Sequence, residues 1–145
     1  MELNIARDYS PYTGLRHSAN SDLSGEDFYH QILNAAFAKA YKNDEELQLD
    51  LDGSLDGYAP SFLDEAIGNL VYDFGLEIVQ SMLIIKSERE SQWNTMIQQQ
   101  TLPNWAKRKR NNSEPKVTEN HPAWYRLIDG KLQLRVWCTP VDQNI

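Results

Sequence analysis

Residues 46–52, ELQLDLD, constrain the fold more than any other stretch, because their side chains alternate strictly between polar and apolar. On an extended chain, Leu47, Leu49 and Leu51 fall on one face and the acidic and amide side chains on the other. This pattern is typical of a strand with one packed face and one face in water, whereas a strand between two helix layers is apolar throughout. The sequence therefore predicts a sheet with helices mainly on one face.

The segment that follows this strand changes to a helical period. Apolar side chains recur at three- and four-residue spacing from Leu63 to Phe74, and Gly75 is well placed to end the helix. The apolar run SMLIIK, residues 81–86, comes after a short link and is expected to be a buried strand. Strand, helix and strand together predict a parallel crossover unit, and with it an α/β fold class.

Capping patterns predict two more helices. Ser24 with Asp27 three residues later marks the start of one, and Ser87 with Glu90 marks the start of another. Pro103 is expected to end or kink the second helix. The polar stretch 110–122, RNNSEPKVTENHP, is rich in turn-forming residues and is expected to be a mobile loop.

A β-hairpin is predicted near the C-terminus, where Asp129-Gly130 separates two alternating runs in AWYRLIDGKLQLRVW. Pairing across this turn sets Tyr125 opposite Leu134 and Leu127 opposite Leu132, so that these four side chains share one face. The other face carries Trp124, Arg126, Gln133 and Arg135.

Length and composition indicate a small protein of the reducing cell interior. A chain of 145 residues suits a single domain, and Cys138 is the only cysteine, which excludes an internal disulfide. The N-terminal MELNIARDYS lacks the features of a signal peptide, and no apolar run reaches the roughly 20 residues needed to cross a membrane. We expect a cytoplasmic protein without membrane contact, and the net charge of -7 argues against indiscriminate binding to nucleic acid.

Two stretches resemble the STAS-like family of unknown function. LQLDLDGSLDGYAPSFLDEAIGNL, residues 47–70, contains a strand that ends in Asp-x-x-Gly, followed by a turn and the helix start PSFxxE. Upstream, GLRHSANSDLSGEDFYHQIL, residues 14–33, is similar to the family's lead-in. The resemblance implies a single STAS-like domain over residues 1–145, with a mixed β-sheet, helices mainly on one face and the C-terminal hairpin. Its core spans about residues 1–86, and residues 87–145 elaborate it.

The same resemblance implies a regulatory role. In the similar anti-sigma-factor antagonists, a histidine-kinase-like ATPase phosphorylates a serine at the start of a helix, and this phosphorylation switches protein partners. Ser61 falls at about that place in this sequence. STAS-like members are also associated with such ATPases and with prokaryotic conflict or antiviral defence gene clusters.

Two interpretations of Ser61 stay open. As a helix N-cap it contributes about 1 kcal/mol, and Asp64 completes the capping pattern. As a phosphate acceptor it places about -1.5 to -2 charges among acidic neighbours that repel them, although a helix N-terminus favours an anion. The expected regulatory or partner-contact surface is the helix start with the acidic turn before it. Its residues are Asp52, Asp56, Tyr58, Ser61, Phe62, Asp64 and Glu65.

Catalysis, cofactors and metals find little support in the sequence. His17, His30 and His121 are scattered, and the spacings of metal sites, phosphate-binding loops and a serine nucleophile elbow are absent. The loop from Asp52 has oxygen side chains at positions one, three and five of a calcium loop, but Leu63 stands where a glutamate ligand is required. We therefore expect a non-catalytic protein without cofactor or metal.

One basic cluster offers an alternative function. Trp105 precedes Lys107, Arg108, Lys109 and Arg110, which combines an aromatic side chain for base stacking with cations for phosphates. The same cluster suits an acidic protein partner, or the solvated end of a helix. The alternative is thus a nucleic-acid-binding accessory protein, which the family resemblance would place in a bacterial or phage conflict or defence system.

Overall fold

A computed structural model describes residues 1–137. Cys138, the only cysteine, lies outside the described residues. The strands are β1 (Glu2–Asn4), β2 (Leu47–Asp50), β3 (Leu83–Lys86), β4 (Trp124–Ile128) and β5 (Lys131–Arg135). The α-helices are α1 (Ile5–Asp8), α2 (Gly25–Phe28), α3 (Asn34–Lys42), α4 (Pro60–Phe74), α5 (Leu76–Met82), α6 (Gln92–Met96) and α7 (Leu102–Arg110). Two π-helical segments, η1 (Tyr29–Leu33) and η2 (Ile97–Thr101), join α2 to α3 and α6 to α7.

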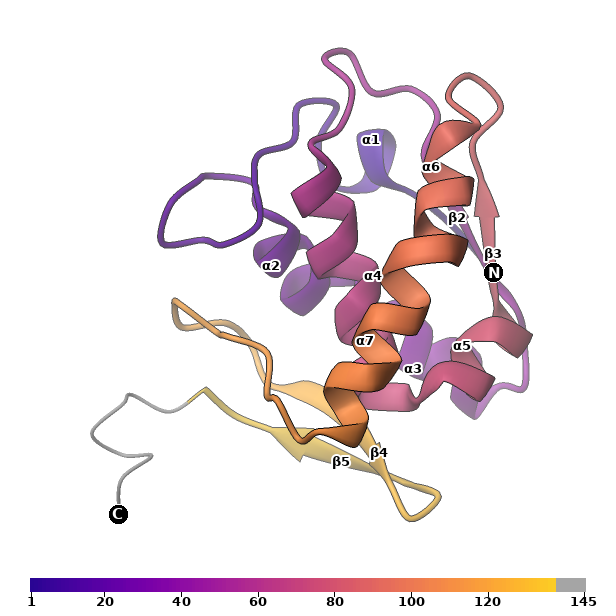
Figure 1. The fold of residues 1–145 in the computed structure, drawn as a ribbon, viewed down its shortest axis with the longest axis vertical. Helices are drawn as coiled ribbons and strands as arrows, with labels where there is room; N and C mark the ends of the chain where they lie inside the picture. Colours follow the sequence, from indigo (N-terminus) through magenta and orange to yellow (C-terminus); the bar gives the residue numbers. More distant parts are fainter. Residues whose placement is uncertain (138–145) are drawn as a thin grey trace.

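The central sheet contains β1, β2 and β3 in that spatial order, and both pairs of neighbours are parallel. This confirms the predicted parallel unit of strand, helix and strand around α4. The expected mixed sheet is wrong for the described residues, because the antiparallel pair β4–β5 forms a separate two-stranded sheet. The fold is α/β with two small sheets (Figure 1).

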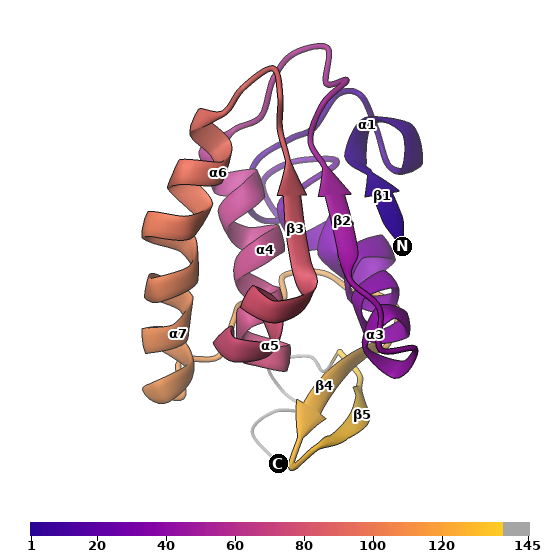
Figure 2. The same ribbon diagram turned by 90° about the vertical axis from the view of Figure 1, so that its right-hand side faces the viewer.

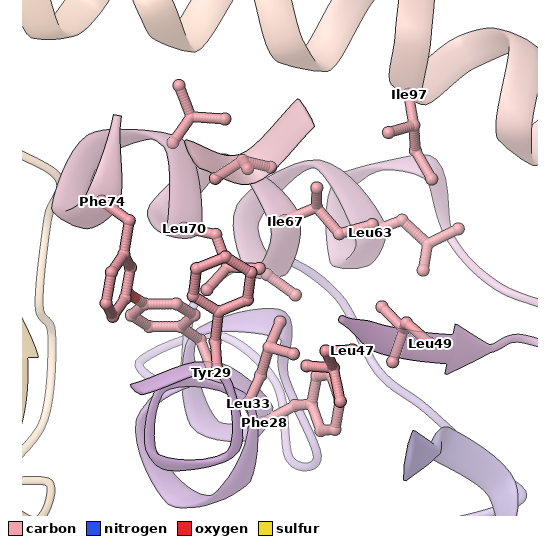
Figure 3. Packing of buried hydrophobic residues seen from close by; sticks show 14 of the residues in the cluster. Phe28, Tyr29, Leu33, Leu47, Leu49, Leu63, Ile67, Leu70, Phe74 and Ile97 are labelled. Atoms are coloured by element: carbon pink, nitrogen blue, oxygen red, sulfur yellow. The ribbon is translucent and has the colours of Figure 1, made fainter. Parts of the chain in front are cut away.

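Helices cover one face of the parallel sheet, as the alternation in β2 predicts (Figure 2). Leu47 and Leu49 are fully buried, while Gln48 and Asp50, which alternate with them along the strand, are half-buried. In Figure 3 the two leucines point toward side chains from α4 and from the helix that starts at Gly25. The strand β3 was expected to be buried but lies at the sheet edge, with Ile84 42% exposed.

The hairpin has the predicted register. Tyr125 pairs with Leu134 and Leu127 with Leu132, and Asp129 and Gly130 both take positive φ in the turn. Asp129-Gly130 therefore sets the pairing, as a two-residue turn of this composition does.

Helix starts agree with the sequence in one case and differ in two. Ser24 caps α2, because its Oγ accepts a hydrogen bond from the Asp27 amide. The start predicted at Ser61 is wrong: α4 begins at Pro60, and Ala59 is its N-cap. Proline is favoured at the first helical position, since its fixed φ suits the helix and its missing N–H would lack a partner there anyway.

The later helix also starts and ends differently. It begins at Gln92 rather than at Ser87, whose Oγ instead donates a hydrogen bond to the Glu90 carbonyl. It does not end at Pro103 but continues to Arg110. The π-helical segment η2 lies just before Pro103, and such segments change the hydrogen-bonding register of a helix where a regular one is interrupted.

Candidate functional site

Ser61 lies at the second position of α4, and its side chain is half-buried. No residue within 1–137 makes a hydrogen bond with its hydroxyl group, and α4 has no side-chain cap. The interpretation of Ser61 as a helix cap is therefore wrong. Among residues 1–137, its hydroxyl group takes no part in the hydrogen bonding that holds the fold together.

Arg16 partly neutralises the two acidic side chains that follow Ser61. Its Nη1 lies 2.8 Å from Asp64 Oδ2 and 3.0 Å from Glu65 Oε1. Burial lowers the pKa of Arg16, but the hydrogen bonds to the two carboxylates outweigh burial and raise it. In the sequence Asp64 and Glu65 look like unpaired negative charges, and nothing signals Arg16 as their partner, because 48 and 49 residues separate it from them.

The pieces of sequence that carry the family resemblance meet at this helix start. Gly25 lies against the backbone of Phe62, where a Cβ would come within 2.3 Å of the Phe62 carbonyl oxygen. The Gly25 and Glu26 amides donate to the carbonyls of Leu15 and Arg16 at 2.9 and 3.0 Å. We call Arg16, Ser61, Asp64 and Glu65 the helix-start site.

Two of the predicted contact residues belong to the core instead. Phe62 is fully buried, with its ring centroid 5.8 Å from that of Phe28 and 5.9 Å from that of Tyr58. Tyr58 is 8% exposed, and its hydroxyl donates to the Leu51 carbonyl. Neither side chain is presented to a partner, so they position α4 rather than contact anything outside the chain.

The acidic turn has both a structural and an exposed part. The Asp52 carboxylate accepts hydrogen bonds from the Glu88 and Arg89 amides, each at 3.1 Å, and these bonds lower its pKa. Asp52 therefore ties the turn to the loop after β3. Asp56 is exposed, and Leu55 beside it is 65% exposed. These two side chains are available to a partner.

The three histidines, scattered in sequence, gather near Glu26. His121 Nε2 lies 2.6 Å from Glu26 Oε2, His17 Nδ1 lies 3.2 Å from Glu26 Oε1, and the rings of His30 and His121 stack at 4.9 Å. Burial raises the pKa of Glu26, but hydrogen bonds from His121, Thr118 and Ser18 reverse the shift and lower it to about 2. No spacing in the sequence signals this cluster, since Glu26 and His121 are 95 residues apart.

This cluster does not have the geometry of a serine nucleophile with its base. Ser18 Oγ lies 3.5 Å from His121 Nε2, the same ring nitrogen that is bound to Glu26 at 2.6 Å. A general base needs a free ring nitrogen directed at the hydroxyl group.

The geometry instead suits a structural link between α2 and residues 111–123, which we call the strap. Residues 110–122, which make up most of the strap, were expected to be a mobile loop, but Thr118 and His121 are hydrogen-bonded to Glu26.

A second buried link holds the hairpin. Arg126 Nε donates to Asp73 Oδ1 at 2.7 Å, and its terminal nitrogens donate to Glu114 at 2.9 and 3.0 Å. Asp73 also accepts a hydrogen bond from Tyr29. Burial raises the pKa of Asp73, and the nearby Arg126 cation opposes this shift.

The basic cluster at the end of α7 is only partly available. Trp105 is 3% exposed, and its Nε1 donates to Asp64 Oδ2 at 3.2 Å, so its predicted role as a base-stacking platform is wrong for this structure. The Arg108 guanidinium lies 4.5 Å from the Trp105 ring centroid, and Lys109 donates to the Tyr72 carbonyl. Lys107 and Arg110 remain exposed.

Comparison with known proteins supports the family resemblance. Residues 24–93 match the family model described as a STAS-like domain of unknown function (DUF4325), which confirms the resemblance inferred from the sequence. This region includes Glu26, the acidic turn and the whole of α4, whereas Arg16, the strap and the hairpin fall outside it. No curated protein and no solved structure matches the chain. Within residues 1–137, every helix is too short or too polar to cross a membrane.

Proposed function

We propose that the protein is a non-catalytic STAS-like regulatory domain that binds a protein partner and is controlled at Ser61. The observation that carries this proposal is the Ser61 hydroxyl group, which is half-buried at the start of α4 and has no hydrogen-bond partner among residues 1–137. A serine that is not a cap is open to modification at no cost to the helix. Ser61, Asp56 and Leu55 form the contact surface in this proposal, on the frame that Asp52, Tyr58 and Phe62 hold.

The local charge favours a modification that changes binding. Arg16 partly neutralises Asp64 and Glu65, so a phosphate on Ser61 meets weaker repulsion than the acidic sequence suggests. The helix N-terminus adds about 0.3–1 kcal/mol in favour of the anion. The proposed modifying partner is an ATPase of the histidine-kinase-like class, which the family resemblance suggests.

The first experiment is phosphate mapping. The wild-type protein is incubated with ATP and an extract of its host, and mass spectrometry locates any phosphate. We expect phosphate on Ser61 in the wild type and in Ser54→Ala, a control that removes a serine from the preceding turn. Phosphate on other residues only, or on none, would contradict the proposed control at Ser61.

The second experiment tests the partner. Wild type, Ser61→Ala and Ser61→Asp are compared as baits, and the retained proteins are identified. A partner held by the first two and lost with Ser61→Asp is expected, because only aspartate adds charge. Identical partners on all three baits would show that Ser61 has no part in recognition.

The nucleic-acid alternative relies on Lys107 and Arg110, since Trp105 is buried and Arg108 and Lys109 make contacts within the chain. Within residues 1–137, only two of the four cations in this cluster are free of such contacts, and the protein has a net charge of -7, which together favour the protein partner over nucleic acid. Tight binding of nucleic acid that weakens steeply with salt, and that Lys107→Gln with Arg110→Gln abolishes, would reverse this ranking.

A further inference from the structure

A pocket of about 520 Å³ lies among the strap, the hairpin and the helical layer. Its walls come from strap residues 114–118, from β4 and the end of β5, and from His30 and Asn69. In Figure 1 the first two walls belong to the orange chain that follows α7 and to the yellow hairpin. Small-molecule sites in proteins span about 300–1,000 Å³, so the pocket has the volume of a ligand site.

His30 is the unexplained group in this pocket. It is 4% exposed, and its Nδ1 has no hydrogen-bond partner among residues 1–137. Its ring stacks on His121 at 4.9 Å and meets the Trp124 ring edge-on at 4.4 Å. A buried polar nitrogen without a partner costs stability, and a phenylalanine would make similar ring contacts without that cost. The Nδ1 atom itself is enclosed and is not reached from the pocket, so His30 offers a ligand its ring rather than this nitrogen.

The remaining lining residues indicate the chemistry of that ligand. The lining contains the cations of Lys116, Arg126 and Arg135 and one acidic residue, Glu114, so the charged lining has a net charge of +2 in a protein of net charge -7. Arg126 is already bound to Asp73 and Glu114, which leaves Lys116 and Arg135 for an anion. Trp124 and Trp137 supply aromatic surface, and a hydrogen bond from Trp137 Nε1 to the Val117 carbonyl holds Trp137 in place.

We propose that this pocket binds a small molecule that carries a planar aromatic ring and an anionic group. The ring packs against the tryptophans and the His30 ring, and the anion binds Arg135 and Lys116. The site does not depend on Ser61, and it would couple a small ligand to the strap and the hairpin.

Calorimetric titration of the full chain tests the proposal with five probes. Adenosine 5′-monophosphate and indole-3-carboxylate both combine a ring with an anion, and they separate a nucleotide from an aromatic acid as the source. Adenosine and indole lack the anion, and inorganic phosphate lacks the ring. We expect at least one of the first two to bind at least tenfold more tightly than its uncharged counterpart and than phosphate. Failure of both to bind at millimolar concentration, or equal binding of the neutral probes, would overturn the proposal.

Two variants assign the binding to this pocket. Arg135→Gln is expected to weaken binding at least tenfold, because it removes a charged hydrogen-bond donor, while Arg110→Gln is a matched control on the exposed end of α7. His30→Phe keeps an aromatic ring in the pocket wall, so it is expected to leave binding largely unchanged and the melting temperature unchanged or raised. Unaltered affinity in Arg135→Gln would exclude the pocket as the site, and this test holds even if His30→Phe does not fold.

Discussion

The helix-start site and the C-terminal part of the chain are both held to the core by ion pairs, but the two sets of pairs differ in their exposure to water. At the helix-start site, the Arg16 and Asp64 side chains are 36% and 27% exposed, although Glu65, the other partner of Arg16, is 1% exposed. Beneath the strap and the hairpin, the Glu26 and Asp73 side chains are 0% and 1% exposed, and that of Arg126 is 10% exposed. Pairs in contact with water exchange partners at little cost, whereas buried pairs are costly to break.

This difference separates the water-exposed Arg16–Asp64 pair from a buried structural attachment. The strap and the hairpin lie outside the residues that match the family model, yet buried charges join them to α2 and α4 within it. They are therefore a built-in part of the fold rather than an appendage. The helix-start site, by contrast, keeps a half-buried serine beside an ion pair that water reaches.

The largest expected effect comes from breaking the buried attachment. Arg126→Met leaves Asp73 buried without its cation, and we expect a loss of about 3–5 kcal/mol in the free energy of unfolding, measured by urea denaturation. Arg7→Met removes the arginine of an exposed pair with Asp8 and should leave stability almost unchanged. Equal losses in the two variants would mean that the two kinds of attachment do not differ in strength.

Acid should lower the free energy of unfolding through the buried side chain of His30. Burial, with a smaller effect from His121, lowers the pKa of His30 from 6.5 to about 3, so the folded protein holds a neutral ring. Below pH 6.5 the unfolded chain binds a proton at His30 that the folded chain does not bind. The free energy of unfolding therefore falls as the pH falls from about 6.5 toward 3.

His30→Phe removes the titrating ring and isolates this effect. Its free energy of unfolding should fall less between pH 7 and pH 4 than that of the wild type, by an amount on the order of 2–3 kcal/mol. Urea denaturation at both pH values measures the difference. Protonation of Glu26, whose pKa is lowered from 4.5 to about 2, also lowers the free energy of unfolding, but mainly below pH 4.5 and equally in both proteins. Parallel pH profiles would contradict a neutral, buried His30.

Gly25→Ala tests how closely the helix-start site is packed. The new Cβ would come within 2.3 Å of the Phe62 carbonyl oxygen, so we expect a loss of about 1–3 kcal/mol and shifted amide resonances at Arg16 and Phe62. Gly57→Ala is the control, because nothing lies within 4 Å of its Cβ and only its φ of +74° opposes the change. That control should leave the Arg16 resonance in place. An unshifted Arg16 in Gly25→Ala would show that the site tolerates the change.

The smallest effects separate a true cap from a free serine. Ser24→Ala removes the hydrogen bond to the Asp27 amide and should cost about 1 kcal/mol in the free energy of unfolding. Ser61→Ala removes no hydrogen bond within residues 1–137 and should change stability by less than about 0.5 kcal/mol. Thermal denaturation of the two variants side by side gives the comparison. A cost at Ser61 equal to that at Ser24 would restore its interpretation as a cap.

Local patterns in the sequence determined the elements whose cause is local. The alternation around Leu47 and Leu49 predicted a strand with one packed face, Ser24 predicted a helix start, and Asp129-Gly130 predicted the hairpin with its register. Each depends on residues only a few positions apart, so neighbouring side chains and turn geometry suffice. The proline at the start of α4 is the local signal that places the helix start before Ser61.

Tertiary structure alone decided the contacts that give those elements their roles. The pairing of Arg16 with Asp64 and Glu65, the gathering of the histidines around Glu26 and the burial of Trp105 join residues 9 to 95 positions apart. Side-chain charge and polarity are visible in a sequence, but whether a charge is paired or a ring is buried depends on which distant segments pack together. For that reason the sequence by itself identified Ser61 and the basic cluster as candidates. Only the tertiary structure shows that the Ser61 hydroxyl group has no hydrogen-bond partner among residues 1–137. Likewise, only the tertiary structure shows that much of the basic cluster is engaged in contacts within the chain.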